Sequence, residues 1–348
     1  MKSIFILNLV LFTSFPFYNE TIAQTTPHFD STYYQFILNE TTSFRRHTSA
    51  RNADMDNDGD SDVVVANGTF SSAGFTFVRN LGNGFYSSPT HYLASLFSND
   101  VAVGDFNNDG LKDVVVSNTG INWEGTIISV FLNLGNASFG PAVNYTVGRG
   151  PIGVTAADLD NDGDIDIAVA NNGSFGNGST VSVLVNNGNA TFQNALTFPG
   201  GNAPFKIRAA RINNDNLLDL VVANGSRIVN ILFNTGNNNF TNRVELISES
   251  GFSNGLYGAV AIDDIDNDND NDILYAPGFR FTGSSDRGSV ALFRNQGTGT
   301  FNPVQYLQSV LFTLPSTDVE VADLNGDGWK DIVTTSPLPE QLMDIWFI

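Results

Sequence analysis

The chain has 348 residues, of which 41% are hydrophobic and 15% charged, a composition typical of a folded globular protein and not of a disordered one. Its formal net charge is -20, from 36 acidic and 16 basic residues, so the electrostatics argue against nucleic acid and anionic membrane surfaces as partners and favour cations. The chain contains no cysteine, which excludes disulfides, thiol catalysis and zinc–thiolate sites.

Residues 1–24 have the pattern of a secretory signal peptide. A basic residue precedes an apolar run, and a small-residue sequence, TIA, ends at Ala23. A membrane anchor needs about 20 apolar residues, and this run is shorter and interrupted by Asn8 and Pro16. The sequence therefore predicts cleavage directly after Ala23 or one residue later, a secreted, extracellular mature protein, and no membrane span in residues 25–348.

A nine-residue acidic motif recurs six times along the rest of the chain. The first copy, DMDNDGDSD, covers residues 54–62 and carries five carboxylates. The other copies are DFNNDGLKD (105–113), DLDNDGDID (158–166), RINNDNLLD (211–219), DIDNDNDND (264–272) and DLNGDGWKD (323–331). Because successive copies start 51 to 59 residues apart, the sequence predicts six structural repeats.

Each copy has the same flanking segments in the same order. An apolar run such as VAVG (101–104) precedes it and a β-branched run such as DVVVSN (113–118) follows it, and both compositions indicate strands. A third run, such as ISVFLN (128–133), leads through an Asn/Gly turn, NLGNASF (133–139), to a fourth, weaker strand. Four short antiparallel strands in about 53 residues, with no helical periodicity, match one blade of a β-propeller.

The two ends of the chain bear on the number of blades. The last repeat has three strand-like segments within residues 319–348 and lacks a fourth, whereas residues 27–38 have the pattern of a fourth strand. We therefore predict an all-β protein, a six-bladed propeller over residues 25–348, in which the N-terminal strand completes the last blade and leaves no open edge. Seven blades remain the alternative if the chain continues beyond Ile348.

The side chains of the motif point to a divalent cation. Carboxylate or carboxamide oxygens occupy positions 1, 3, 5 and 9, with Arg211 as the exception, and Gly or Asn at position 6 permits the positive φ that folds the loop around a central point. Such hard oxygen ligands suit Ca²⁺, which takes about 6 to 8 of them, better than Mg²⁺. Without a cation, like charges about 4 Å apart repel by about 4 kcal/mol at an effective dielectric constant of 20. The alternative is that the motifs are solvated acidic hairpin turns.

The motif also begins like the calcium loop of an EF-hand. That loop ends in a bidentate Glu at position 12 and lies between two helices. Here position 12 is Val65, Val116, Val169, Val222, Tyr275 or Thr334. Because each of these lies in or beside a predicted strand, the EF-hand interpretation is excluded.

The repeats resemble the FG-GAP or VCBS repeats of integrin α-subunit propellers and of many secreted proteins. The resemblance rests on the acidic loop, its strand context and the Phe-Gly-Pro of NASFGPAV (136–143), and it extends from about residue 28 to the end of the chain. It implies a propeller whose loops hold structural Ca²⁺ through the side chains at positions 1, 3, 5 and 9 and the carbonyl at position 7. It says little about function.

Transferred residue by residue, the resemblance implies five calcium loops. Their ligands would be Asp54, Asp56, Asp58, Asp60 and Asp62; Asp105, Asn107, Asp109, Leu111 and Asp113; Asp158, Asp160, Asp162, Asp164 and Asp166; Asp264, Asp266, Asp268, Asp270 and Asp272; and Asp323, Asn325, Asp327, Trp329 and Asp331. The fourth loop begins with Arg211, whose guanidinium cannot ligate a cation but can pair with Asp215 and Asp219. We therefore predict about five structural Ca²⁺ ions and one loop stapled by its own arginine.

No pattern in the sequence marks an active site. Nucleophile motifs, a phosphate-binding glycine loop and a metal-binding histidine pair are all missing from the sequence. The first-strand residues expected to line the central channel are mostly Val, Ala and Gly, which disfavours an enzyme. The alternative is an extracellular propeller lyase or hydrolase with its active site on the face opposite the acidic loops.

The repeats differ most in the loops between second and third strands, which lie on that opposite face. There Trp123, Phe279, Arg280 and Phe281 are candidate ligand-binding residues, since aromatic and arginine side chains anchor interfaces. The competing interpretation is that the aromatic rings pack onto the blades. We expect a monomeric binding or adhesion module whose ligand is a glycan or an extracellular protein.

Overall fold

Antiparallel strands make up nearly all of the regular structure in this computed structural model. The structure describes residues 47–68, 73–136, 138–174, 178–248, 258–277, 289–308, 318–335 and 343–346. Within them, 23 strands form six antiparallel sheets, five with four strands and one with three. Two short 3₁₀ turns, Ile121–Trp123 and Gly225–Arg227, join second strands to third strands. The predicted all-β class and the four-stranded antiparallel blade are confirmed.

Each sheet is formed by consecutive strands of one repeat. Blade 1 contains β1 (His47–Ala53), β2 (Asp62–Asn67), β3 (Gly74–Val78) and β4 (Thr90–Leu93). Blade 2 contains β5 (Ser98–Gly104), β6 (Asp113–Asn118), β7 (Ile127–Phe131) and β8 (Val143–Thr146). Blade 3 contains β9 (Pro151–Ala157), β10 (Asp166–Asn171), β11 (Thr180–Leu184) and β12 (Leu196–Pro199).

The other three blades follow the same order. Blade 4 contains β13 (Pro204–Ala210), β14 (Asp219–Asn224), β15 (Ile228–Phe233) and β16 (Asn242–Ile247). Blade 5 contains β17 (Ala259–Asp263), β18 (Asp272–Ala276), β19 (Ser289–Phe293) and β20 (Gln305–Gln308). Blade 6 contains β21 (Asp318–Ala322), β22 (Asp331–Thr335) and β23 (Met343–Trp346).

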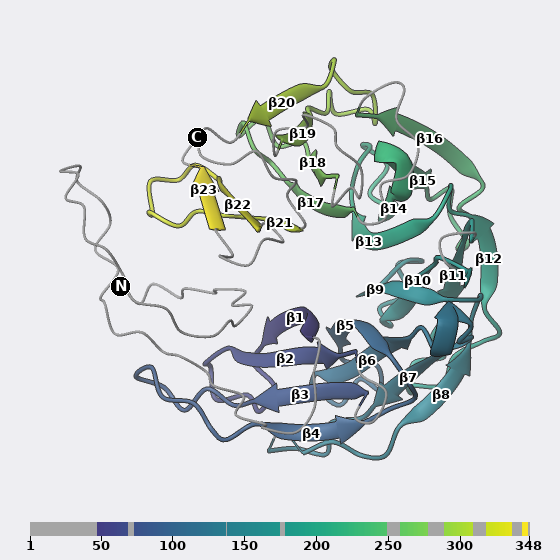
Figure 1. The fold of residues 1–348 in the computed structure, drawn as a ribbon, viewed down its shortest axis with the longest axis vertical. Helices are drawn as coiled ribbons and strands as arrows, with labels where there is room; N and C mark the ends of the chain where they lie inside the picture. Colours follow the sequence, from purple (N-terminus) through teal and green to yellow (C-terminus); the bar gives the residue numbers. More distant parts are fainter. Residues whose placement is uncertain are drawn as a thin grey trace.

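The six sheets are arranged around a common centre, with the first strand of each innermost and the later strands progressively farther out (Figure 1). The first strands contact one another in succession from β1 through β5, β9, β13 and β17 to β21. Residues 27–38, expected to close the ring, and the expected signal peptide, residues 1–24, lie outside the described residues. Closure of the ring by the N-terminal strand therefore stays a prediction. In the part of the chain that the structure describes, no helix has the length and apolarity needed to cross a membrane.

The second strands hold the blades together. Every residue of β6, β10 and β14 is buried, because both faces of these strands pack against neighbouring blades. Such strands carry continuous apolar runs instead of alternating polar and apolar residues. Between blades 1 and 2, the ring of Phe75 packs edge-on against those of Phe131 and Phe139, with centroids 5.0 and 5.2 Å apart.

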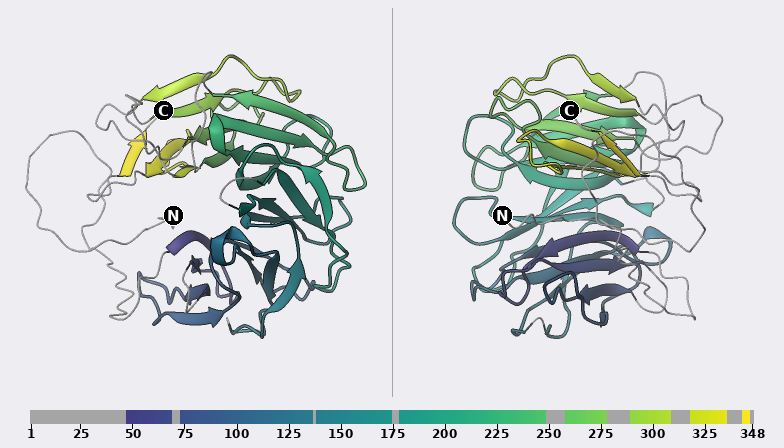
Figure 2. Two further views of the ribbon diagram at one scale, coloured as in Figure 1. Left: turned by 45° about the vertical axis from the view of Figure 1, so that its right-hand side comes forward. Right: turned by 90° about the vertical axis from the view of Figure 1, so that its left-hand side faces the viewer.

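The chain direction places the connections on two faces (Figure 2). In an antiparallel blade, the first-to-second and third-to-fourth connections lie at one end of the strands, and the second-to-third connections at the other. The acidic motifs join first to second strands in all six blades. We call their side the loop face and the opposite side the far face.

Candidate metal centres and a charged axis

The acidic loops are tight turns with two left-handed residues. Position 6 has φ between 63° and 95° in all six loops, for example at Gly59 and Asn216, as the sequence predicts. Position 4 is also left-handed in five of the loops, for example at Asn57 with φ 61°. Asparagine is one of the few non-glycine residues that adopts this region readily. The two reversals wrap the chain around the centre of the loop.

Backbone N–H groups fix the carboxylates of each loop. In loop 1, Asp54 accepts hydrogen bonds from the N–H of Asp58 at 3.2 Å and of Gly59 at 2.9 Å. The position-1 residues Asp105, Asp158, Asp264 and Asp323 accept the same pair of bonds. The position-7 residues Asp60, Leu111, Asp164, Asp270 and Trp329 donate their N–H to the position-5 carboxylate. These bonds hold the side chains of positions 1 and 5 within the turn.

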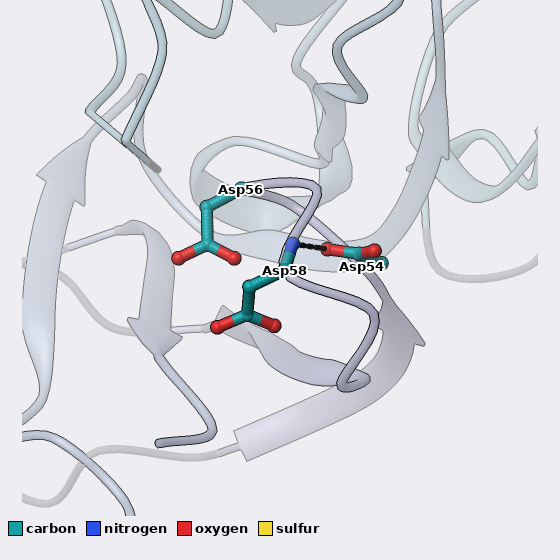
Figure 3. Close-up of side chains that lie close together, drawn as sticks. All are labelled: Asp54, Asp56 and Asp58. Atoms are coloured by element: carbon teal, nitrogen blue, oxygen red, sulfur yellow. Dashed lines mark hydrogen bonds between the residues drawn. The ribbon is translucent and has the colours of Figure 1, made fainter. Parts of the chain in front are cut away.

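Three loops bring three carboxylates together. The groups are Asp54, Asp56 and Asp58 (Figure 3), then Asp158, Asp160 and Asp166, and then Asp264, Asp266 and Asp268, each with oxygens within 4.8 Å of one another. In loops 2 and 6, position 3 is an asparagine, and the Nδ2 atoms of Asn107 and Asn325 donate to the position-5 carboxylate at 2.9 Å. The predicted ligands at positions 1, 3 and 5 therefore lie side by side in loops 1 and 5, and in loop 3 position 9 takes the third place.

The donor set fits a hard cation such as Ca²⁺. All the side-chain donors are oxygens of Asp or Asn. The Oδ1 atoms of Asp56, Asp266 and Asp331 are buried and have no hydrogen-bond partner. A buried carboxylate oxygen without a partner is energetically costly unless a proton or a cation satisfies it.

The aspartate at position 9 has a second role that the sequence does not reveal. In loop 3, Asp166 is fully buried, and its oxygens accept the N–H of Leu159 at 3.0 Å and of Asn186 at 2.8 Å. Asp62, Asp113, Asp219 and Asp272 make the same two bonds. Burial raises the pKa of Asp166 to about 7 and that of the other four to about 6, against the opposing effect of these hydrogen bonds. Position 9 therefore joins the acidic loop to the turn after the third strand.

An asparagine in that turn links each of acidic loops 1 to 4 to the following blade. Asn133, Asn186, Asn234 and Asn295, the interblade asparagines, are buried. Their Nδ2 atoms donate to the carbonyl oxygens of Met55, Phe106, Leu159 and Ile212, each at position 2 of the preceding blade's loop, at 2.6 to 2.8 Å. The same residue thus holds its own position-9 aspartate and the loop of the blade before it.

The arginine staple predicted for loop 4 is wrong. The side chain of Arg211 is exposed, and the structure pairs it with neither Asp215 nor Asp219. The oxygens of Asp219 already accept backbone N–H groups, as in the other blades, and Asp215 accepts the Nδ2 of Asn213 at 2.9 Å. Loop 4 keeps its shape through these bonds without a carboxylate at position 1.

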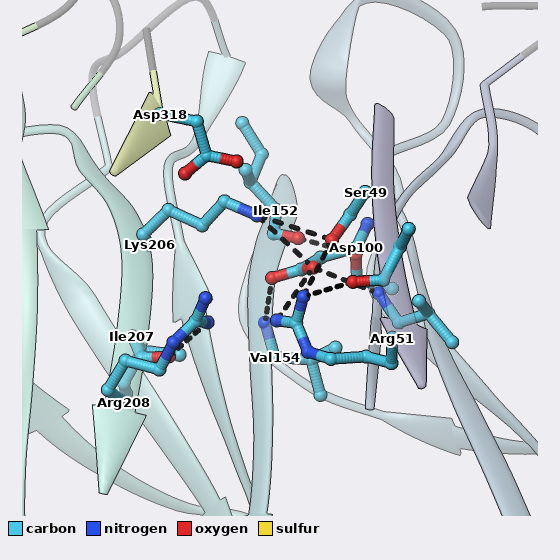
Figure 4. A network of polar contacts seen from close by, with 12 residues as sticks. Ser49, Arg51, Asp100, Ile152, Val154, Lys206, Ile207, Arg208 and Asp318 are labelled. Atoms are coloured by element: carbon cyan, nitrogen blue, oxygen red, sulfur yellow. Dashed lines mark hydrogen bonds and ion pairs between the residues drawn. The ribbon is translucent and has the colours of Figure 1, made fainter. Parts of the chain in front are cut away.

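The axis carries charged side chains where the sequence analysis expected mostly Val, Ala and Gly (Figure 4). Asp100 of β5 is 1% exposed, and its Oδ1 lies 3.3 Å from Arg51 Nη2 of β1 and 3.2 Å from Lys206 Nζ of β13. Its Oδ2 accepts the N–H of Val154 at 3.2 Å. Arg208 of β13 pairs with Glu320 of β21 at 3.4 Å. These ion pairs connect four of the six innermost strands, and two of them skip a blade.

The charges at the axis satisfy one another. Burial alone would raise the pKa of Asp100, but the charges of Lys206, Arg51 and Arg208 together hold it well below its usual range. Burial, with the charge of Arg208, lowers the pKa of Arg51. A carboxylate held ionised in this way is unsuited to donate a proton near neutral pH. Beside the pairs lies a recess of about 140 Å³, whose charged lining residues are Arg208 and Glu320.

Aligned repeats contain a signal for this cluster. Asp100, Lys206 and Asp318 each lie five residues before their acidic motif, and Arg51, Arg208 and Glu320 lie three before it. Positions two apart on a strand point to the same side, here the axis. The charges differ from blade to blade, so a search for what the repeats share passes over them.

Of the predicted ligand-binding residues, the structure describes Trp123 alone. Trp123 is half-buried in the 3₁₀ turn Ile121–Trp123 on the far face, and has φ of 61°. Phe279, Arg280 and Phe281 lie outside the described residues.

Comparison with known families identifies the repeats. The model of the FG-GAP-like repeat matches residues 54–116, 118–169, 158–222, 211–275 and 264–334, and these ranges include all six acidic loops. No curated protein sequence matches the chain significantly.

Several solved structures share the fold. An Agrocybe aegerita lectin that recognises non-reducing terminal N-acetylglucosamine is 20% identical, with a TM-score of 0.53 over 82% of this chain and 74% of that chain. The fucose-specific lectin from Aleuria aurantia is 15% identical, with a TM-score of 0.51 over 86% and 91%. BBS1N, in a complex with ARL6DN, is 12% identical, with a TM-score of 0.52 over 84% and 80%. At these identities the likeness establishes the propeller fold alone.

Proposed function

Because this chain belongs to the FG-GAP-like repeat family, we propose that it is a secreted, calcium-stabilised β-propeller that binds glycans. Secretion is supported by the signal-peptide pattern of residues 1–24. Calcium is supported by the carboxylates that converge within 4.8 Å in loops 1, 3 and 5 and by the partnerless buried oxygens of Asp56, Asp266 and Asp331. Two such carboxylates repel by about 4 kcal/mol at an effective dielectric constant of 20, which a bound divalent cation would reverse.

A rigid aromatic corner on the far face is the observation that carries the glycan proposal. Three segments meet there: the 3₁₀ turn with Trp123, the crossing from blade 2 to blade 3, and the start of the next far-face loop. Backbone bonds join them, from Gly150 N–H to Gly125 at 2.7 Å and from Gly173 N–H to Arg149 at 2.9 Å. We call residues 119–126, 148–151 and 172–174 the blade 2–3 corner.

The chemistry of this corner suits a sugar. Trp123 offers an aromatic surface, and the Glu124–Arg149 ion pair beside it, at 2.6 Å with both side chains about half exposed, offers charged hydrogen-bonding groups. Trp123 has a φ of 61°, a left-handed conformation that costs such a residue about 1–3 kcal/mol and is concentrated at functional sites. The two lectins with this fold bind N-acetylglucosamine and fucose respectively, which supports a glycan as the ligand class.

A glycan array followed by calorimetric titration tests this proposal. We expect Trp123→Ala to weaken binding of the best glycan at least tenfold while the melting temperature changes little. Phe85→Ala is the matched control, because that phenylalanine is 68% exposed in the connection between β3 and β4 on the loop face and should not affect glycan binding. Unchanged binding by Trp123→Ala would contradict the assigned site. No binding to any glycan would overturn the ligand class and favour an extracellular protein.

The axis gives weaker support for an enzyme. Its buried carboxylate, Asp100, is shared by two cations, and Glu320 pairs with Arg208. A propeller hydrolase or lyase needs acid and base groups whose pKa values lie near the working pH, and the pKa of Asp100 is lowered instead. We therefore propose a binding protein.

A further inference from the structure

Two arginines reach into acidic loops 1 and 5. Arg79 Nε contacts Asp56 Oδ2, and Arg79 Nη2 donates to Asp58 Oδ2 at 3.2 Å. Arg294 Nη1 contacts Asp266 Oδ2 in the same way. Asp56 and Asp266 occupy position 3 and Asp58 position 5, so the guanidinium groups hold carboxylates that a bound cation would need.

The two arginines occupy equivalent places in their repeats. Each stands directly before the turn asparagine that follows the third strand, Asn80 in blade 1 and Asn295 in blade 5. The equivalent residues of blades 2, 3 and 4 are Leu132, Val185 and Phe233. These side chains carry no charge, so among the five blades whose turn after the third strand is described, two have a cationic side chain in contact with the loop.

Loop 3 is the natural comparison for loops 1 and 5. All three loops carry five aspartates. In loop 3, however, the position-3 carboxylate accepts a bond from a neutral donor, Asn238 Nδ2, to Asp160 Oδ2 at 2.7 Å. The residue equivalent to the arginines is Val185, which is 7% exposed. The loops therefore match in carboxylate number and differ in the charge placed against them.

We propose that Arg79 and Arg294 are built-in competitors of the cation, which give loops 1 and 5 a lower calcium affinity than loop 3. This inference rests on the calcium sites of the proposed function. Binding of Ca²⁺ at either loop must displace a guanidinium from its carboxylates or leave two like charges close together, and both reduce affinity. In the metal-free state the same arginine neutralises part of the repulsion among the aspartates. As the calcium concentration rises, Ca²⁺ would thus replace the arginine side chain in loops 1 and 5, whereas loop 3 would already hold its Ca²⁺.

Calcium titration of arginine variants tests the proposal. Ions are counted by native mass spectrometry and affinities measured by calorimetry on the secreted chain. Arg79→Gln and Arg294→Gln should each raise the affinity of one site at least tenfold and leave the number of bound ions unchanged. Arg79→Lys, which keeps the charge, should remain close to the parent protein.

Two further variants complete the design. Val185→Arg should weaken one site at least tenfold by giving loop 3 the competitor it lacks. Arg243→Gln removes an equal charge on the outer strand β16, where the side chain is 34% exposed and pairs with Glu245, and should leave all calcium sites unchanged. Calcium binding that is the same in Arg79→Gln, Arg294→Gln and the parent would overturn this proposal and keep the calcium sites. An absence of bound calcium in every protein would overturn the calcium sites themselves.

Discussion

The loop face and the axis both concentrate charge, but they balance it differently. In the acidic loops, carboxylates of one sign are packed within 4.8 Å and are held mainly by backbone N–H groups. At the axis, Asp100 is shared by Arg51 and Lys206, and Glu320 pairs with Arg208. The loops carry a surplus of negative charge that a cation from solution can neutralise, whereas the charges at the axis are neutralised by other side chains of the protein. The contribution of the acidic loops to stability should therefore depend on the cation concentration in solution, whereas that of the axis should depend on the side chains that the chain places there.

Chelation should have the largest effect, and should act on the loops alone. A ligand at 100 times its dissociation constant stabilises a protein by about 2.7 kcal/mol per site, so about five sites supply on the order of 10 kcal/mol. We expect excess chelator to lower the melting temperature of residues 25–348 by more than 10 °C, and elemental analysis of the untreated protein to find about five calcium ions per chain. An unchanged melting temperature and no bound metal would reduce the loops to acidic turns.

Asp100→Asn should remove the buried ion pairs at the axis and destabilise the protein whether or not calcium is present. Removing one partner of a buried ion pair leaves the other charge uncompensated and costs about 3–5 kcal/mol. We expect a loss of that size in urea unfolding, equal with calcium and with chelator. Glu320→Gln is the control, because its partner contact is long and the side chain is 42% exposed, so the loss should stay below about 1 kcal/mol.

The pH dependence separates this effect from a packing defect. The folded-state pKa of Asp100 lies below its ordinary value of 3.8, so its ionic contribution is complete above about pH 4 and is lost as the pH falls below that value. The stability difference between the parent protein and Asp100→Asn should thus be constant from pH 7 to about pH 5 and shrink below pH 4. A difference that does not change with pH would show that the aspartate contributes shape and not charge.

Asn186→Ala should have a smaller effect, confined to the joint between two blades. The variant removes the two bonds from Nδ2, to the carbonyl of Ile165 and to that of Phe106, which keeps the N–H of Ala190; the loss of two such bonds costs about 1–3 kcal/mol. We expect that loss in urea unfolding and faster hydrogen exchange in loop 2. Asn187→Ala changes the adjacent, exposed residue and should cost less than about 0.5 kcal/mol. Equal losses in the two variants would contradict the role of the interblade asparagine.

The repeated parts of the structure were predictable, because six copies of a pattern reinforce one another. The strands, the acidic loops and the left-handed residue at position 6 all follow from columns that the repeats share. The recurring aspartate at position 9 is the instructive case. The family resemblance assigns it to the metal, yet loop 4, where position 1 is Arg211, also has an aspartate at position 9, and this Asp219 accepts two backbone N–H groups. A residue that all the repeats share can have two structural roles, and only the three-dimensional geometry distinguishes them.

The parts that the sequence concealed depend on spacing in three dimensions. Asp100 and Lys206 are 106 residues apart and lie two blades from each other, so their pairing requires the ring to place them across the axis. Gly153 of β9 lies between them in chain order, and a Cβ there would be 2.5 Å from the carbonyl oxygen of Phe205, so its lack of a side chain lets β9 and β13 approach. The staple predicted for Arg211 failed for the opposite reason. It was inferred from Asp215 and Asp219, which are close to Arg211 in sequence, but the oxygens of both already accept other hydrogen bonds.

The interblade asparagine also bears on how such a chain can grow. Every repeat that has one supplies a donor to the blade before it and offers a position-2 carbonyl to the blade after it, for example Asn186 toward Phe106 and Leu159 toward Asn234. The joint is head-to-tail, so a duplicated repeat brings both halves of the bond it needs. Duplication or loss of whole units therefore requires no new joining chemistry. The number of blades is limited by the angle between neighbours and not by the bond that connects them.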